Sequence, residues 1–206
     1  MSKALHTIKT EHKNYARVLA CLARVLDGLG ARSEPEHREL LFMILDYIEA
    51  FPATFHHPKE DQYLFVALRR RRPETAPLID RVADEHAQSL DLLADFRAAC
   101  DAYRGDPATL ANVREAGRRY HGFEQAHMLR EEAEVLPLAS EALTEADWCE
   151  IDAAFARNDD PLFGSLRAAQ FDRLFRWILE AAWDIATSGA DPPTHVENPV
   201  ERIPAS

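Results

Sequence analysis

Two stretches of this sequence place a glutamate four residues after a histidine. His56 is followed by Glu60, and His127 is followed by Glu131. Residues four apart lie on the same face of an α-helix, so each pair would present an imidazole and a carboxylate together. An exposed pair of this kind is an ordinary surface ion pair, but Glu131 has the helical phase of the apolar residues around it. A buried carboxylate needs a counter-charge, and a bound metal ion supplies one.

Two more histidines, His12 and His86, lie within stripes of apolar residues at helical spacing. A lone histidine in such a stripe is most often a core residue with a hydrogen-bond partner. Six groups spread over four predicted helices indicate a metal centre instead, and the candidate ligands are His12, His56, Glu60, His86, His127 and Glu131. Imidazole and carboxylate ligands without thiolate suit iron, with manganese or zinc as substitutes. Carboxylates from facing helices can each bridge two ions.

The stretch FHHPKEDQYLF contains a competing pair, His57 with Asp61, also four residues apart. At 100° per residue, this pair and the pair formed by His56 and Glu60 point to different sides of the helix. Glutamate reaches farther than aspartate, which suits a bridge between two ions. We therefore expect His56 and Glu60 to be the ligands. The groups that remain candidates for an outer hydrogen bond or an extra ligand are His57, Asp61, Tyr63, Tyr120 and His121.

The elements that must position these residues are predicted to be helices. Glycine is scarce, and no long stretch alternates polar and apolar residues with a period of two. Apolar residues at spacings of three and four mark four long helices. The first ends at DGLGAR, the second runs from SEPEHREL to Pro73 with interruptions near Pro52 and Pro58, the third ends before YRGDP, and the fourth begins after Pro107. Short connections between long helices predict an all-α fold, an antiparallel up-down four-helix bundle.

One or two additional helices are expected after the bundle. Thr144 and Asp147 form a capping-box pattern before a short helix, and FDRLFRWILEAAW has the pattern of an amphipathic helix. That helix would pack on the bundle or on a partner chain, as in a homodimer. We expect the four-helix bundle at 1–142, a C-terminal helical extension at 143–188, and a disordered, proline-rich tail at 189–206.

Composition restricts the partners and the compartment. A formal net charge of −11 opposes binding to nucleic acid or to an anionic membrane surface. The three cysteines have no CxxC spacing, which suggests a reducing compartment. The sequence has no signal-peptide pattern and no apolar stretch long enough to span a bilayer. We therefore expect a soluble, cytoplasmic protein without nucleic-acid or membrane partners.

Four stretches of the sequence resemble the hemerythrin-like, HHE cation-binding family: IKTEHKNYARVLACL, HHPKEDQYLF, VADEHAQSLDLL and HMLREEAEVLPLASEALTEADW. The resemblance covers residues 4–164. It implies a four-helix bundle around a non-haem di-iron centre with an oxo or hydroxo bridge. Carried over by position, the terminal ligands would be His12, His56, His86 and His127, and the bridging carboxylates would be Glu60 and Glu131.

The sequence departs from the oxygen-carrying members of that family on the third helix. Those proteins have a His-x-x-x-His pair there, but here Val82 stands four residues before His86. Two octahedral ions offer about twelve positions, of which four histidines, two bridging carboxylates and a bridging oxygen fill about ten. Either the remaining positions accept exogenous ligands, or a fifth protein group fills one of them.

These observations predict a metal-binding protein whose di-iron centre binds or reacts with dioxygen, peroxide or nitric oxide, in sensing, scavenging or the repair of iron centres. A redox partner would accompany such a role. Two alternatives stay open, an iron-homeostasis or storage module and a helical interaction protein with a vestigial site. The sequence alone does not decide whether the protein turns over a substrate as an enzyme.

Overall fold

A computed structural model describes residues 2–30, 34–103, 106–157, 160–164 and 169–187 of the chain. These residues form helices and short connections, and none of them lies in a strand. The prediction of an all-α protein is therefore confirmed. The tail expected at 189–206 lies outside the described residues.

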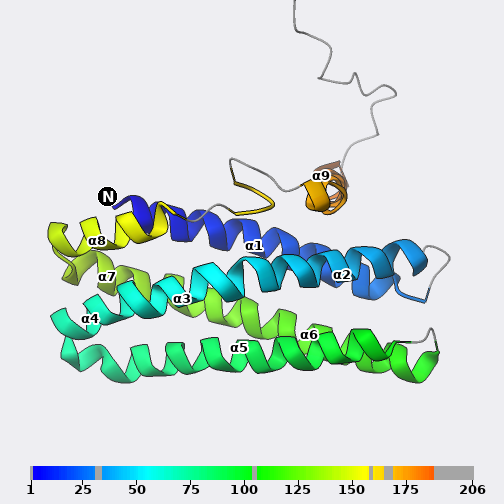
Figure 1. Cartoon of the computed structure of the whole chain (residues 1–206), viewed down its shortest axis with the longest axis horizontal. Helices are drawn as coiled ribbons and strands as arrows, with labels where there is room; N and C mark the ends of the chain where they lie inside the picture. The colour runs from blue at the N-terminus through cyan, green and yellow to red at the C-terminus, as the bar shows by residue number, and fades with distance from the viewer. Residues whose placement is uncertain (1, 31–33, 104–105, 158–159, 165–168, 188–206) are drawn as a thin grey trace, which may run out of the picture.

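Four long helices lie side by side (Figure 1): α1 (Lys3–Gly28), α2 (Glu34–Ala50), α5 (Ala76–Ala102) and α6 (Pro107–Arg130). Helix α1 contacts both α2 and α6, and α6 also contacts α5. The start of α6 follows from local chemistry. Asp106 accepts hydrogen bonds from the backbone N–H groups of Ala108 and Thr109, and Pro107 occupies the first turn, where no N–H is needed.

Two of these helices continue through π-helical turns. After α2 come the π-helical turn Pro52–His56, α3 (His57–Lys59), the π-helical turn Glu60–Phe65 and α4 (Val66–Arg71). A 3₁₀ turn, Pro73–Thr75, joins α4 to α5. After α6 come the π-helical turn Glu131–Val135 and α7 (Leu136–Ala142). Such turns are rare and are frequently found at functional sites.

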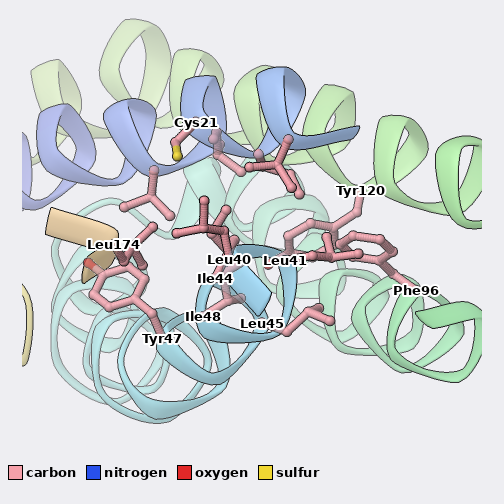
Figure 2. Packing of buried hydrophobic residues seen from close by; sticks show 14 of the residues in the cluster. Cys21, Leu40, Leu41, Ile44, Leu45, Tyr47, Ile48, Phe96, Tyr120 and Leu174 are labelled. Carbon is pink, nitrogen blue, oxygen red and sulfur yellow. The ribbon is translucent and has the colours of Figure 1, made fainter. Parts of the chain in front are cut away.

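The buried apolar residues form two clusters, with a polar layer between them along each helix. In α1, for example, Ile8 belongs to one cluster and Tyr15 to the other, and the buried polar residues Glu11 and His12 lie between them. Figure 2 shows part of the cluster that α1, α2, α5, α6 and α9 share, in which Phe96 and Tyr120 lie side by side. Burying a large apolar side chain contributes about 1.5–3 kcal/mol, so the two clusters fix the helices on both sides of the polar layer.

The helices after the bundle pack on the same chain. Helix α8 (Glu145–Phe155) begins with the expected capping box, in which Thr144 and Asp147 each accept a hydrogen bond from the other's backbone N–H. Helix α9 (Asp172–Thr187) follows a 3₁₀ turn, Ala169–Phe171. Three buried side chains of this segment join the apolar cluster of α1 and α2. They are Phe171 of the 3₁₀ turn and Leu174 and Ile178 of α9.

All three cysteines are free thiols, and none belongs to the buried polar groups of the polar layer. Cys21 and Cys100 are buried among apolar residues, whereas Cys149 is exposed. No helix in the described part of the chain combines the length and the apolar character needed to cross a membrane.

Candidate metal centre

Five histidines and two glutamates meet in the polar layer between the two apolar clusters. They form two groups, and within each group the nitrogen or oxygen atoms that could bind a metal ion lie within 4.8 Å of one another. All seven side chains are buried. The first group contains His12, His56, Glu60 and Glu131, and the second contains His57, His86 and His127.

Four of the histidines turn Nε2 toward the centre and Nδ1 toward a carboxylate. The Nε2 atoms meet in pairs, His12 with His56 and His86 with His127, both at 3.1 Å. A carboxylate accepts the Nδ1–H bond, which leaves Nε2 as the atom with a free lone pair. The Nδ1 partners are Glu132 for His12 at 3.1 Å, Glu11 for His56 at 2.8 Å, Asp61 for His86 at 2.9 Å and Glu85 for His127 at 3.0 Å.

Glu60 and Glu131 lie between the two groups of histidines. Glu60 oxygens are 3.4 Å from Nε2 of His56 and 3.7 Å from Nε2 of His86. Glu131 oxygens are 3.3 Å from Nε2 of His12 and 3.5 Å from Nε2 of both His86 and His127. Each glutamate therefore touches histidines of both groups, which is the placement that a bridging carboxylate requires.

The oxygens of these two glutamates test whether metal ions fit the site. All four oxygens of Glu60 and Glu131 are buried and have no hydrogen-bond partner. Leaving a buried acceptor unsatisfied costs about 1–3 kcal/mol, and more for a charged group. Cations between the carboxylates and the inward Nε2 atoms would satisfy all of them, and the donor set of imidazole and carboxylate suits iron. The residues present fit a pair of metal ions.

The buried carboxylates and histidines of the centre shift one another's pKa values. Burial and the neighbouring Glu131 raise the pKa of Glu60 well above its ordinary value. Burial also raises the pKa of Glu131, but His127 and His12 outweigh it and hold that pKa well below the ordinary value. Burial lowers the pKa of His12, but Glu131 and Glu132 raise it to about 9. The centre thus attracts positive charge.

The π-helical turns explain how the adjacent residues His56 and His57 both point inward. The backbone N–H of His57 bonds to the carbonyl of Pro52, five residues earlier. A turn with five-residue spacing rotates successive side chains by less than 100°, so the simple helical phase no longer holds. His56 consequently faces His12, whereas His57 belongs to the group of His86 and His127. A regular helix would turn the two side chains to different sides, and the sequence left His57 open as an outer group or an extra ligand. The structure groups it with His86 and His127, where the three rings could hold a metal ion.

His57 supplies the second group with a third imidazole. Its ring stacks on that of His86, with centroids 4.3 Å apart and planes 9° apart. Burial holds the pKa of His57 well below its ordinary value, so the ring is neutral, which is the form that binds metal. Val82, where the oxygen-carrying relatives have a histidine, is buried in an apolar cluster. The third imidazole of this group thus comes from His57, and not from the position of Val82.

The other candidates for outer contacts or an extra ligand have different positions. Asp61 accepts the Nδ1–H bond of His86, on a different helix. Tyr120 is buried, and its hydroxyl pairs with that of Tyr15 at 2.7 Å. Tyr63 is half-buried against an apolar cluster, and His121 is half-buried. Neither Tyr63 nor His121 belongs to the two groups.

Three of the four outer carboxylates were not predicted from the sequence, namely Glu11, Glu85 and Glu132. A signal was present, because every outer carboxylate immediately neighbours a candidate ligand in the sequence, as Glu11 neighbours His12. The bonds themselves cross between helices, however. Glu11 binds His56, and Glu85 binds His127. Sequence spacing within one helix gives no such pairing.

A cavity of about 410 Å³ reaches the centre at His12. It lies between α1 and the last turns of the α6 segment, and its lining is mostly apolar side chains and alkyl stems. The lining residues are His12, Lys13, Ala16, Gln125, Met128, Leu129 and Glu132. A small molecule in this cavity would adjoin the histidine group that has only two imidazoles.

One comparison with known proteins supports a cation-binding site in this layer. Residues 3–139 match the family model described as the hemerythrin HHE cation binding domain. Comparison with curated proteins and with solved structures gave no match. The matched segment ends within α7, earlier than the resemblance over 4–164 suggested, but it contains every residue of both groups. With most of its length matched and all seven groups inside the match, the chain belongs to the hemerythrin HHE cation-binding family.

Proposed function

We propose that this protein is a non-haem di-iron protein whose centre binds or reacts with dioxygen, peroxide or nitric oxide. One observation carries the proposal. Glu60 and Glu131 are buried between two groups of histidines, and none of their oxygens has a hydrogen-bond partner. A single ion would leave one group of histidines without metal, whereas two ions would use both groups and both oxygens of each carboxylate.

The ligand assignment divides the histidines between two ions. His12 and His56 would hold one ion, His57, His86 and His127 would hold the other, and Glu60 and Glu131 would bridge them. The outer carboxylates fix each ring by accepting its Nδ1–H bond. When bound, the ions supply Lewis-acid and one-electron chemistry. The chain itself contributes the orientation of the donors and two apolar clusters that exclude water.

The asymmetry of the donors favours reactivity over a purely structural metal. With five histidines, two bridging carboxylates and a bridging solvent oxygen, about one of twelve positions stays open. That position belongs to the ion of His12 and His56, which has one imidazole fewer. The cavity beside His12 provides a route for a small ligand to this ion. A closed structural site would need neither feature.

The finer description of the scaffold is part of the same proposal. The course of the chain in Figure 1 supports an antiparallel up-down four-helix bundle at 1–142 with a helical extension at 143–188. Three free thiols support a reducing, cytoplasmic setting. A redox partner would recycle the iron. A second copy of the chain would bind through α9, which a mass measurement in solution tests.

Anaerobic reconstitution tests the proposal. Ferrous iron is added to the purified protein, excess metal is removed, and iron per chain is measured. Optical spectra are then recorded after addition of dioxygen, hydrogen peroxide or nitric oxide. We expect two ions per chain and a changed spectrum with at least one of the three. The double variant Glu60→Ala/Glu131→Ala serves as the metal-free control. One ion or fewer per folded chain, or a loaded protein indifferent to all three molecules, would contradict the proposal.

A further inference from the structure

A third buried glutamate shares the properties of Glu60 and Glu131. Glu124 lies on α6, one turn before His127. In the part of the chain that the structure describes, the buried side-chain oxygens without a hydrogen-bond partner belong only to Glu60, Glu131 and Glu124. In Glu124 this oxygen is Oε2, because Oε1 accepts a hydrogen bond from Ser89 Oγ at 2.5 Å. Ser89 thus fixes one oxygen of Glu124, and the other oxygen is available to bind an ion.

Distances separate the carboxylates around the centre into two classes. The oxygens of the outer carboxylates lie 2.8 to 3.1 Å from the histidine Nδ1 atoms whose hydrogen bonds they accept. The inner carboxylates, Glu60 and Glu131, lie 3.3 to 4.0 Å from the histidine Nε2 atoms. Oε2 of Glu124 lies 4.0 Å from Nε2 of His57, too far for a hydrogen bond. This distance belongs to the inner class.

Burial gives the same division. The outer carboxylate side chains are between 9% and 43% exposed, so water can solvate them. The side chains of Glu60, Glu131 and Glu124 are 0% to 1% exposed. A carboxylate removed from water to this degree costs several kcal/mol unless a positive group compensates it. The imidazole 4.0 Å from Oε2 of Glu124 belongs to His57, a member of the second histidine group, so an ion held by that group would supply this charge.

We propose that Glu124 is a third inner carboxylate, a terminal oxygen ligand of the ion held by His57, His86 and His127, with Ser89 as its positioning residue. The inference rests on the proposed function, because it presupposes two ions. Three imidazoles and one oxygen each from Glu60, Glu131 and Glu124 would give this ion about six protein donors, so Glu124 would take the position that a bridging solvent oxygen otherwise fills. The vacant positions then lie at the ion of His12 and His56, on the side of the cavity.

Cobalt substitution tests the role of Glu124 without any assay of activity. Wild type, Glu124→Ala, Glu124→Gln, Ser89→Ala and the control Glu115→Gln, an exposed carboxylate on the same helix, are loaded with Co²⁺. Three quantities are measured: cobalt per chain, the affinity of each ion in competition with a chromophoric chelator, and the visible absorption per cobalt. Far-ultraviolet circular dichroism establishes that each variant is folded, and Glu124→Gln keeps the volume of the side chain.

If Glu124 is a ligand, Glu124→Ala should lower the affinity for one of the two ions by more than the roughly 10- to 100-fold effect of losing an outer partner. It should also raise the visible absorption, because cobalt bands intensify when the coordination number falls. Ser89→Ala should weaken the same ion by about 10-fold, and Glu115→Gln should change nothing. Wild-type affinities and spectrum in Glu124→Ala would overturn the inference. So would a weakening within the outer range with an unchanged spectrum, which would make Glu124 an outer partner of His57. Fewer than two ions in wild type would instead overturn the proposed function.

Discussion

The Nε2 atoms of His12 and His56 lie 3.1 Å apart in the buried centre of the protein. Nδ1 of each ring pairs with its own carboxylate, so when both rings are neutral both Nε2 atoms carry only a lone pair. Two lone pairs at this distance repel unless a cation or a shared proton lies between them. His86 and His127 repeat the arrangement. The site is built to hold positive charge at two points.

Loading the metal-free protein with ferrous iron should therefore raise its stability strongly. An ion that binds only the folded state adds about 4 kcal/mol when the free ion is at about 1,000 times its Kd. Differential scanning calorimetry with and without iron measures the shift in Tm. The double variant Glu60→Ala/Glu131→Ala, which lacks both bridges, should show no such rise. Equal melting temperatures for the loaded and metal-free wild type would reject the prediction.

His57→Ala should remove the ion of the second histidine group and leave the ion of His12 and His56. Metal per chain should fall from two to about one, because a direct ligand and a buried ring are both lost. His121→Ala is the control, since this half-buried histidine belongs to neither group. Retention of two tightly bound ions in His57→Ala would make His57 an outer group, as its helical phase first suggested.

The sequence predicted the helices and the inward phase of His127 and Glu131 because both depend on spacing within one helix. His127 and Glu131 follow the apolar phase of their helix, and the structure places them in the centre. Contacts that cross between helices were not predictable in this way. Glu85 neighbours His86 in the chain, but it binds His127. Knowing this pairing requires the relative rotation of α5 and α6.

The assignment of His57 could not be predicted for a different reason. Helical phase assumes a constant rotation per residue, and the π-helical turns Pro52–His56 and Glu60–Phe65 break that assumption on both sides of His57. Pro58 signals an irregularity, since it lacks the N–H that a regular helix would use. It does not indicate in which direction the neighbouring side chains rotate. Three-dimensional packing decides that direction.

Asp61→Asn should weaken metal binding without emptying the site. Asp61 accepts the Nδ1–H bond of His86 at 2.9 Å, which fixes the ring and increases its basicity. Loss of such an outer partner typically lowers metal affinity by about 10- to 100-fold. Competition with a chelator measures the change, and Asp80→Asn, an exposed carboxylate paired with Arg69, is the control. Complete loss of one ion in Asp61→Asn would show that Asp61 is itself a ligand.

Ala16→Trp should slow the entry of small ligands. Ala16 lines the cavity beside His12, and an indole there would fill much of its volume. We expect unchanged iron content but a rate of azide or nitric oxide binding at least about 10-fold lower, measured by stopped-flow absorption. Ala20→Trp, one turn farther along α1 and also exposed, should bind at the wild-type rate. Equal rates in Ala16→Trp and wild type would place the entry route elsewhere.

Asp147→Asn should destabilise the contact between α8 and α4. The side chain of Asp147 is 1% exposed, and it accepts hydrogen bonds from Thr144 in its capping box and from Arg70 and Arg71 of α4. Loss of a helix-capping carboxylate costs about 1 kcal/mol. Urea unfolding of the variant and wild type at neutral pH measures the difference. Asp80→Asn, which breaks an exposed ion pair with Arg69, should cost much less.

The contribution of Asp147 to the stability of the protein should also depend on pH in a defined direction. Hydrogen bonds from Arg71 and Thr144 outweigh desolvation and hold the pKa of Asp147 well below its ordinary value. A carboxyl whose pKa is lower in the folded state stabilises the protein above its unfolded pKa, and it loses this effect as the pH falls through the folded pKa. The stability difference between wild type and Asp147→Asn should therefore be full at pH 7 and shrink below about pH 4, near the unfolded pKa. A difference that stays constant from pH 7 to about pH 3 would mean that packing, and not the charge of Asp147, holds α8 in place.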